Sequence, residues 1–213
     1  MRHILTILST FLLSSFCALA LDLGGQNRQD ISLNEGWGYH SIFEVAKKAP
    51  FEPVTLPHTW NVRFIPGTVR YDRAMNVYNR TLTITPEMQG KRLFLYFEGV
   101  NSVASVFINR HIVGEHKGGY LAFCYKITDF VNQGDNLLEV WASNAFRTDG
   151  LPISGDFNVY GGIHRPCHLI VTEQDCIRPD FYASPGVLIR QSNVLAQQAD
   201  LDIETFLSLK SGK

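Results

Sequence analysis

The sequence predicts an all-β chain whose main part is an antiparallel β-sandwich of jelly-roll type. Two observations lead to this fold class. The apolar runs are short, often alternate with a period of two and are separated by turn residues, and no stretch keeps a helical period beyond a turn or two. The 213 residues, of which 45% are apolar and 18% charged, suit one globular domain plus part of a second.

The first third of the chain gives weaker strand signals than the middle. Residues 32–39 read as a turn leading into a first strand, and residues 54–61 alternate briefly. Pro57 restricts the second stretch to a sheet edge or a strand end, because proline cannot donate a ladder hydrogen bond. Residues 64–76 contain Pro66-Gly67 and several charges, so we expect a long excursion there.

The strongest strand signals follow. In residues 77–84, Tyr78, Leu82 and Ile84 share one face with Arg80, and the opposite face is polar. Residues 92–100 carry large apolar side chains on both faces, which is typical of a strand buried on both sides. Further strands are predicted at 103–108, 111–115, 123–127, 137–142 and 168–172.

Two connections are specific enough to predict. Asn109-Arg110 fits a two-residue hairpin turn between the strands at 103–108 and 111–115. Thr128 is placed to cap a single helical turn over residues 128–131.

The two ends of the chain lie outside the sandwich. Residues 1–20 resemble a signal peptide, with a short basic start, an apolar run at 4–16 and a small-x-small pattern ending at Ala20. Cys17 raises a lipoprotein alternative, which we disfavour because Phe16 stands where that signal requires a small residue. We therefore expect cleavage after Ala20, a secreted or periplasmic chain, and no membrane segment after cleavage.

Residues 21–176 are assigned to the jelly-roll domain and residues 177–213 to a linker and the opening strands of a second β domain. Proline and glycine mark the linker, and residues 187–189 and 199–209 read as strands. A β-sandwich of the immunoglobulin type needs about 100 residues, so this second domain is expected to be incomplete.

Charge and composition exclude several partners and cofactors. The net charge is -1, and it becomes -2 once Arg2 is removed with the signal, so nucleic acid is not an expected partner. The histidines show no metal-ligand spacing, because His164 and His168, four residues apart, lie in a region that reads as strand. We predict no metal and no cofactor.

Three cysteines remain after signal cleavage: Cys124, Cys167 and Cys176. At most one disulfide can form among them, with Cys167 and Cys176 the nearest pair in sequence. The alternative is three thiols that pack as small apolar side chains.

The stretch Asp156–Arg165 is the candidate binding segment. It reads Asp-Phe-Asn-Val-Tyr-Gly-Gly-Ile-His-Arg and so combines an acid, an amide, aromatic rings, paired glycines and an arginine. A polar segment with a glycine hinge, at the end of a run of strands, is where such a fold usually carries its binding groups.

Five motifs in order resemble the N-terminal sugar-binding domain of family 2 glycoside hydrolases, with β-galactosidase-type members the nearest likeness. They are Leu56-Pro57-His58-Thr59-Trp60, Phe107-Ile108-Asn109, Gly118-Gly119-Tyr120 with Phe123, residues 136–140, and Asp156 through Tyr160-Gly161-Gly162-Ile163-x-Arg165. The likeness covers residues 30–175, and the tail is similar to the start of that family's immunoglobulin-like domain. It implies a jelly-roll of the galactose-binding-domain-like kind.

The resemblance implies that the two catalytic glutamates lie on a (β/α)₈ barrel that these residues do not include. Retaining hydrolysis needs two carboxyl groups about 5–5.5 Å apart. No carboxylate here matches the family's catalytic motifs, so no catalytic residue is assigned, and the chain alone is expected to be inactive as an enzyme.

The resemblance implies one direct sugar contact, through Asp156, which stands six residues before Gly162. Its carboxylate would accept hydrogen bonds from sugar hydroxyls, and charge-assisted bonds are the stronger kind. The alternative for Asp156 is a turn-capping role after Gly155. Asn158, Tyr160 and Arg165 are further candidate substrate-binding residues, with the alternatives of local backbone bonding, packing and loop anchoring, respectively. For His58 and Trp60 we favour packing over sugar contact.

Three functional hypotheses remain open. The first is the N-terminal sugar-binding part of a secreted glycosidase that hydrolyses the O-glycosyl bonds of β-galactosides or related glycosides. The second is a stand-alone, non-catalytic carbohydrate-binding module, and the third is a truncated gene product. The unfinished strands of the tail favour the first hypothesis over the second.

Overall fold

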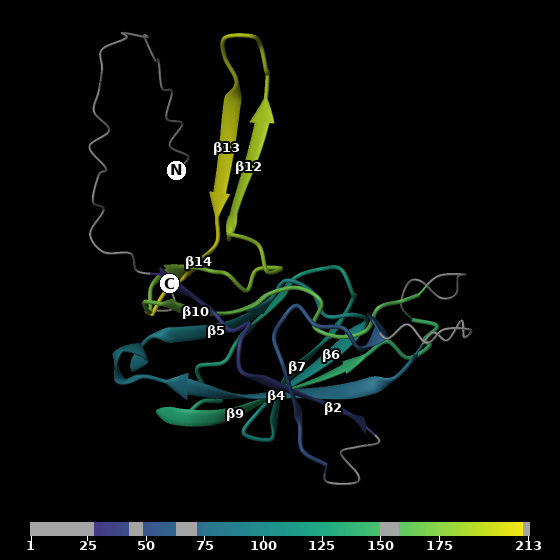
Figure 1. Ribbon diagram of the computed structural model, residues 1–213. Helices are drawn as coiled ribbons and strands as arrows, with labels where there is room; N and C mark the ends of the chain where they lie inside the picture. The colour runs from purple at the N-terminus through teal and green to yellow at the C-terminus, as the bar shows by residue number, and fades with distance from the viewer. Residues whose placement is uncertain (1–27, 43–48, 63–71, 150–157, 211–213) are drawn as a thin grey trace, which may run out of the picture.

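The computed structural model describes residues 28–42, 49–62, 72–149 and 158–210, and it is a two-layer antiparallel sandwich followed by a protruding hairpin (Figure 1). One layer has the strand order β1-β10-β5-β8, with bounds β1 Arg28–Ser32, β10 Cys167–Thr172, β5 Arg92–Phe97 and β8 Phe123–Lys126. The other has the order β3-β2-β4-β9-β6-β7, with bounds β3 Glu52–Val54, β2 Trp37–Ser41, β4 Met75–Ile84, β9 Gly134–Ser143, β6 Val103–Ile108 and β7 His111–Lys117. The predicted all-β sandwich is confirmed.

Alternation along the strands builds the core between the two layers. In β9, Leu138, Val140 and Ala142 are fully buried, whereas the intervening Leu137 and Trp141 are exposed. In β4, Tyr78, Leu82 and Ile84 are buried as the sequence predicts. Because side chains alternate between the faces of a strand, β4 and β9 each contribute one apolar face to the shared core.

β5 is buried on both of its faces. Leu93, Leu95 and Phe97 belong to the core cluster, and Phe94 on the opposite face is only 1% exposed. The prediction of a strand covered on both sides is therefore confirmed.

The hairpin between β6 and β7 forms as predicted. Asn109 and Arg110 have φ values of 50° and 68°, the left-handed conformation that two-residue hairpin turns require. The predicted helical turn at 128–131 is wrong: residues 128–130 form a turn, and the Thr128 hydroxyl accepts a hydrogen bond from the Leu93 amide across to β5 instead of capping a helix. Two 3₁₀ turns lie within the described residues, η1 at Trp60–Val62 and η2 at Pro86–Met88.

β1 lies earlier than the first predicted strand. Arg28, Gln29 and Asp30 are polar and exposed, so the edge strand that pairs with β10 carries no apolar alternation for sequence reasoning to detect.

The tail forms two small sheets beyond the sandwich. β11, Cys176–Ile177, pairs with β14, Leu207–Ser208, and β12, Val187–Ser192, pairs with β13, Asp200–Thr205. The β12–β13 hairpin stands away from the two layers in Figure 1 and exposes large apolar side chains, among them Ile189, Leu201 and Ile203. Two strands are thus present where the sequence predicts them, and the immunoglobulin-like assignment stays a prediction.

The three cysteines that the structure describes are free thiols. Cys167 is fully buried, and Cys124 and Cys176 are half-buried. Burial raises the pKa of Cys124 to about 12, so this group stays a neutral thiol near pH 7. Within the described ranges, no helix is long and apolar enough to cross a membrane. The proposed signal peptide lies outside the described residues.

We predict that the exposed apolar hairpin limits solubility without contributing to the stability of the sandwich. Ile189 and Ile203 are cross-strand partners, 65% and 59% exposed. The double variant Ile189→Thr, Ile203→Thr should raise solubility and leave the thermal unfolding midpoint within about 2 °C.

The control introduces a threonine hydroxyl in the core. Val106→Thr buries a hydroxyl at a fully buried position and should cost about 1–3 kcal/mol in chemical denaturation. A large loss of stability in the hairpin variant would show that β12–β13 packs as part of a completed core, contrary to this prediction.

Candidate functional site

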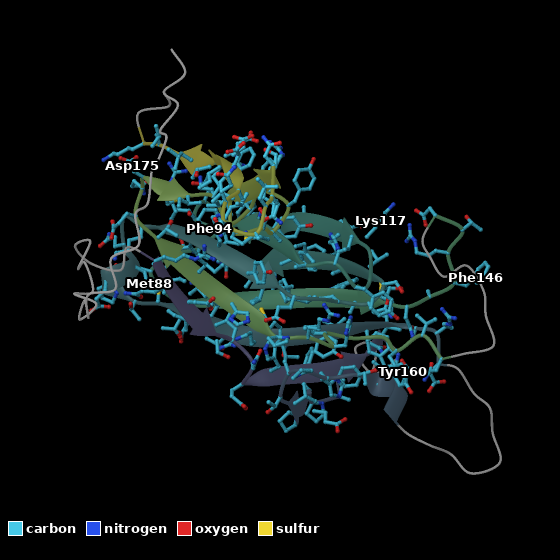
Figure 2. All side chains as sticks on the ribbon, turned by 90° about the horizontal axis from the view of Figure 1, so that it is seen from above. Met88, Phe94, Lys117, Phe146, Tyr160 and Asp175 are labelled. Carbon is cyan, nitrogen blue, oxygen red and sulfur yellow. The ribbon has the colours of Figure 1, made fainter. Side chains whose placement is uncertain are left out.

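The candidate segment lies at one end of the six-stranded sheet. In the order β4-β9-β6-β7, antiparallel pairing brings the start of β4, the end of β9, the start of β6 and the end of β7 to the same end of the sheet. In Figure 2, Tyr160, Lys117 and Phe146 lie toward this end, and Met88 and Asp175 toward the other. The fold therefore gathers residues from distant parts of the chain beside residues 158–165.

The backbone of residues 159–163 is tethered at successive positions. The amide side chains of Asn144, Asn101 and Asn61 bind, respectively, Val159 O at 2.7 Å, Tyr160 O at 2.7 Å and Gly161 N at 2.7 Å. Gly162 exchanges backbone bonds with Asn101, and His58 N donates to Ile163 O at 2.8 Å. A segment with almost every peptide group bonded presents its side chains in a fixed direction.

Asn144 is the centre of this network. It is fully buried directly after β9, and its side-chain nitrogen also donates to Asp72 O at 2.9 Å and, more weakly, to Asn61 Oδ1 at 3.3 Å. Its side-chain oxygen accepts from Ala74 N at 2.8 Å. One amide thus joins residues 72–74, which precede β4, to the candidate segment.

The paired glycines are required by close packing. A Cβ at residue 161 would lie 2.0 Å from the Trp60 ring, and one at residue 162 would lie 2.6 Å from His58 O and from the Tyr78 hydroxyl. Gly162 also has a φ of +123°, which side-chain-bearing residues rarely adopt. The glycines let the segment lie against η1 and β4.

Behind the segment lies an aromatic cluster. His58 Nδ1 is 2.8 Å from the Tyr78 hydroxyl, and Tyr39 stacks near Trp60 with ring centroids 6.3 Å apart. Burial lowers the pKa of His58 and raises the pKa of Tyr78 well above its ordinary value, so both are neutral near pH 7. His58 and Trp60 therefore pack and support the segment, in line with the preferred interpretation of the sequence.

The structure describes three of the four predicted site residues, namely Asn158, Tyr160 and Arg165. Asp156 lies outside the described residues. Tyr160 is 51% exposed, while Asn158 is half-buried and its Oδ1 is buried with no hydrogen-bond partner in the part of the chain that the structure describes. Arg165 is exposed, and its aliphatic stem packs beside Gly99.

Sequence reasoning missed Asn61, Asn101 and Asn144 as the residues that organise the site. Each follows or ends an apolar stretch, where a buried amide is needed to satisfy backbone groups as strands end. The position of these asparagines at the ends of apolar stretches was the sequence signal that could have identified them. Within the described ranges, no cluster of three or more histidine, cysteine, aspartate or glutamate side chains is arranged to hold a metal ion.

The sequence model of a family described as glycosyl hydrolases family 2, sugar binding domain, matches residues 28–173, which is the whole sandwich. The chain belongs to this family.

The relatives of this chain include β-glucuronidases and β-galactosidases. A β-glucuronidase of Bacteroides fragilis is 45% identical over 203 residues, which are 94% of this chain and 28% of the relative. A β-galactosidase of Thermoanaerobacter pseudethanolicus is 32% identical over 139 residues, 62% of this chain and 18% of the relative. The crystal structure of Bacteroides uniformis β-glucuronidase superposes with a TM-score of 0.73 at 32% identity, covering 83% of this chain and 22% of that one. The family 2 chain therefore spans less than a third of the length of these relatives.

We predict that Asn144→Ala lowers the free energy of unfolding by roughly 3 kcal/mol, because it leaves Val159 O buried without this partner and removes the amide's bonds to Asp72 O and Ala74 N. Chemical denaturation measures the loss. Gln133→Ala, at an exposed position, is the control and should change stability by less than about 0.5 kcal/mol. A loss in Asn144→Ala as small as that of the control would contradict the role of this amide.

We also predict that stability falls as the pH is lowered from 7.5 to 5.5. Burial lowers the pKa of His58 and of His116 below the ordinary imidazole value of about 6.5, so the unfolded chain binds protons there before the folded chain does. Stability is therefore lost as the pH falls below about 6.5. Denaturant titrations at several pH values measure the slope, and the variant His58→Gln, His116→Gln should reduce it. An unchanged slope in that variant would disprove the assignment.

Proposed function

We propose that this chain is the N-terminal, sugar-binding part of a secreted family 2 glycosidase whose catalytic residues lie on a barrel outside these 213 residues. The match of the family's sugar-binding domain to the entire sandwich is the observation that carries the proposal. The parent enzyme hydrolyses β-linked glycosides with retention, using two carboxyl groups of the barrel. The predicted signal peptide supports a secreted or periplasmic location.

In this proposal the segment 158–165 forms one wall of the sugar pocket. The three asparagines hold its backbone in place, and Tyr160 is presented outward at 51% exposure. Asp156 stands two residues before this fixed segment, so a carboxylate there would be delivered beside it. A carboxylate accepts two hydroxyl protons at once, which suits recognition of a sugar.

The substrate class rests on the relatives. A β-glucuronide is the first candidate, because the B. fragilis relative that is 45% identical is a β-glucuronidase. A β-galactoside is the second, because the T. pseudethanolicus relative is a β-galactosidase.

A stand-alone carbohydrate-binding module is the competing proposal. The exposed apolar side chains of β12 and β13 speak against it, because a complete module would cover such residues.

A domain exchange tests the proposal. Residues 21–213 would replace the matching N-terminal part of the B. fragilis β-glucuronidase, which is 45% identical to this chain over 94% of the chain's length. The chimera should release nitrophenol from nitrophenyl β-glucuronide with a kcat/KM within about tenfold of the parent, since the barrel supplies the catalytic groups.

Two controls accompany the exchange. The 213-residue chain alone should hydrolyse neither nitrophenyl β-glucuronide nor nitrophenyl β-galactoside, and deletion of the domain from the parent should abolish turnover. A folded but inactive chimera, or turnover by the chain alone, would contradict the proposal. Micromolar binding of free galactose to the chain alone in calorimetry would favour the module.

A further inference from the structure

A cavity of about 310 Å³ lies beside the candidate segment, at the same end of the six-stranded sheet. Its walls come from Arg73 before β4, from the start of β6, from residues 117–121 after β7 and from residues 145–149 after β9. Small-ligand pockets begin at about 300 Å³, so this cavity has room for one sugar ring.

The cavity is positively charged. Arg73, Lys117 and Arg147 line it together with a single carboxylate, Asp149, which gives three positive charges minus one, or +2. The overall chain has a net charge of -1, so the cationic residues are concentrated here against the general balance. A cavity with this sign raises the local concentration of anionic ligands.

The three cations are not equivalent. Asp149 accepts two bonds from Arg147, both at 2.7 Å, and one from Lys117 at 3.0 Å, and these partners hold the pKa of Asp149 well below its usual range. Arg73 has no carboxylate partner among the described residues. Its one hydrogen bond there runs from Nη1 to Asn144 O at 3.3 Å, which holds the guanidinium at the cavity and leaves other N–H groups available.

Two histidine rings bond the backbone of the lining residues Gly118 and Gly119, and Tyr120 adds an aromatic ring to the lining. His116 Nε2 bonds Gly118 O at 3.1 Å, and His164 Nε2 bonds Gly119 O at 2.7 Å. Because a carbonyl only accepts, both ring nitrogens are the donors. Tyr120, 58% exposed, packs edge-on against His164 and offers the rest of its ring to a ligand.

We propose that this cavity is a subsite for the carboxylate of an acidic sugar, with Arg73 as the residue that binds the carboxylate and Tyr120 as the surface on which the sugar ring packs. The planar fork of a guanidinium matches the two oxygens of a carboxylate, which favours a uronic acid over a neutral hexose. Lys117 and Arg147 stay paired with Asp149 and still add to the positive potential of the cavity. The sugar nature of the ligand rests on the proposed function, whereas the preference for an anion rests on the cavity alone.

The test is a titration of the full 213-residue chain, followed by ¹H–¹⁵N NMR, with methyl β-D-glucuronide and with its neutral counterpart methyl β-D-glucoside. For a ligand of one ring we expect a dissociation constant on the order of 1 mM for the glucuronide. The glucoside should bind at least about tenfold more weakly, because it lacks the charge-assisted bond. Raising the salt from about 25 mM to about 300 mM should weaken glucuronide binding.

Two variants with opposite expected effects separate binding from folding. Arg73→Met should weaken glucuronide binding at least about tenfold. Asp149→Asn raises the cavity charge from +2 to +3 and should tighten binding about two- to fivefold, a gain that misfolding cannot produce. Arg190→Met is the matched control, since Arg190 is an exposed arginine of β12 paired with Asp202 and Glu204, and it should change nothing.

Each outcome is decisive for one part of the proposal. Equal affinities for glucuronide and glucoside, or unchanged affinity in both Arg73→Met and Asp149→Asn, would overturn it. Acetate or sulfate binding as tightly as the glucuronide would overturn the sugar subsite and leave a general anion site. An inactive chimera with retained glucuronide binding would contradict the glycosidase proposal alone.

Discussion

The side-chain amide of Asn144 joins parts of the chain that are about 70 residues apart in sequence, by donating to Val159 O and Asp72 O and accepting from Ala74 N. It is fully buried, and its bond to Val159 O lies in the buried interior, so leaving that carbonyl unpaired would cost free energy. Asn61 and Asn101 extend the same arrangement to Gly161 and Tyr160. The direction in which the candidate segment faces depends on these three amides, and Arg73 beside the neighbouring cavity donates to the main-chain oxygen of Asn144.

The sandwich explains why such a group can exist. In the two layers, alternate residues of strands such as β4 and β9 are buried in a shared core. The antiparallel order β4-β9-β6-β7 brings four strand ends together at one end of the sheet. Residues at that end of the sheet follow directly on hydrogen-bonded strands, which fix the position of their backbone. The domain therefore supplies position and charge, and in the proposed enzyme the bond-breaking carboxylates belong to a different domain.

Much of the fold could be predicted from the sequence, because alternation is a direct consequence of strand geometry. Residues 77–84, the hairpin at Asn109-Arg110 and the doubly buried strand at 92–97 all form as the pattern indicates. The polar edge strand β1 and the turn at Thr128 could not be predicted, since their partners lie across the sheet and not nearby in sequence. The same reason applies to the site: the motif 156–165 identifies the segment, but the asparagines that hold it are separated from it by as many as 100 residues.

The most direct test of this account is a crystal structure of the chimera with the B. fragilis β-glucuronidase barrel, soaked with a glucuronide-based inhibitor. The account predicts that the end of the sheet carrying Asn144 faces the barrel. Residues 156–165 should contact the bound sugar, and the cavity of Arg73 should open toward the sugar pocket. A bound sugar with no contact to residues 156–165, or a domain whose opposite end faces the barrel, would contradict it.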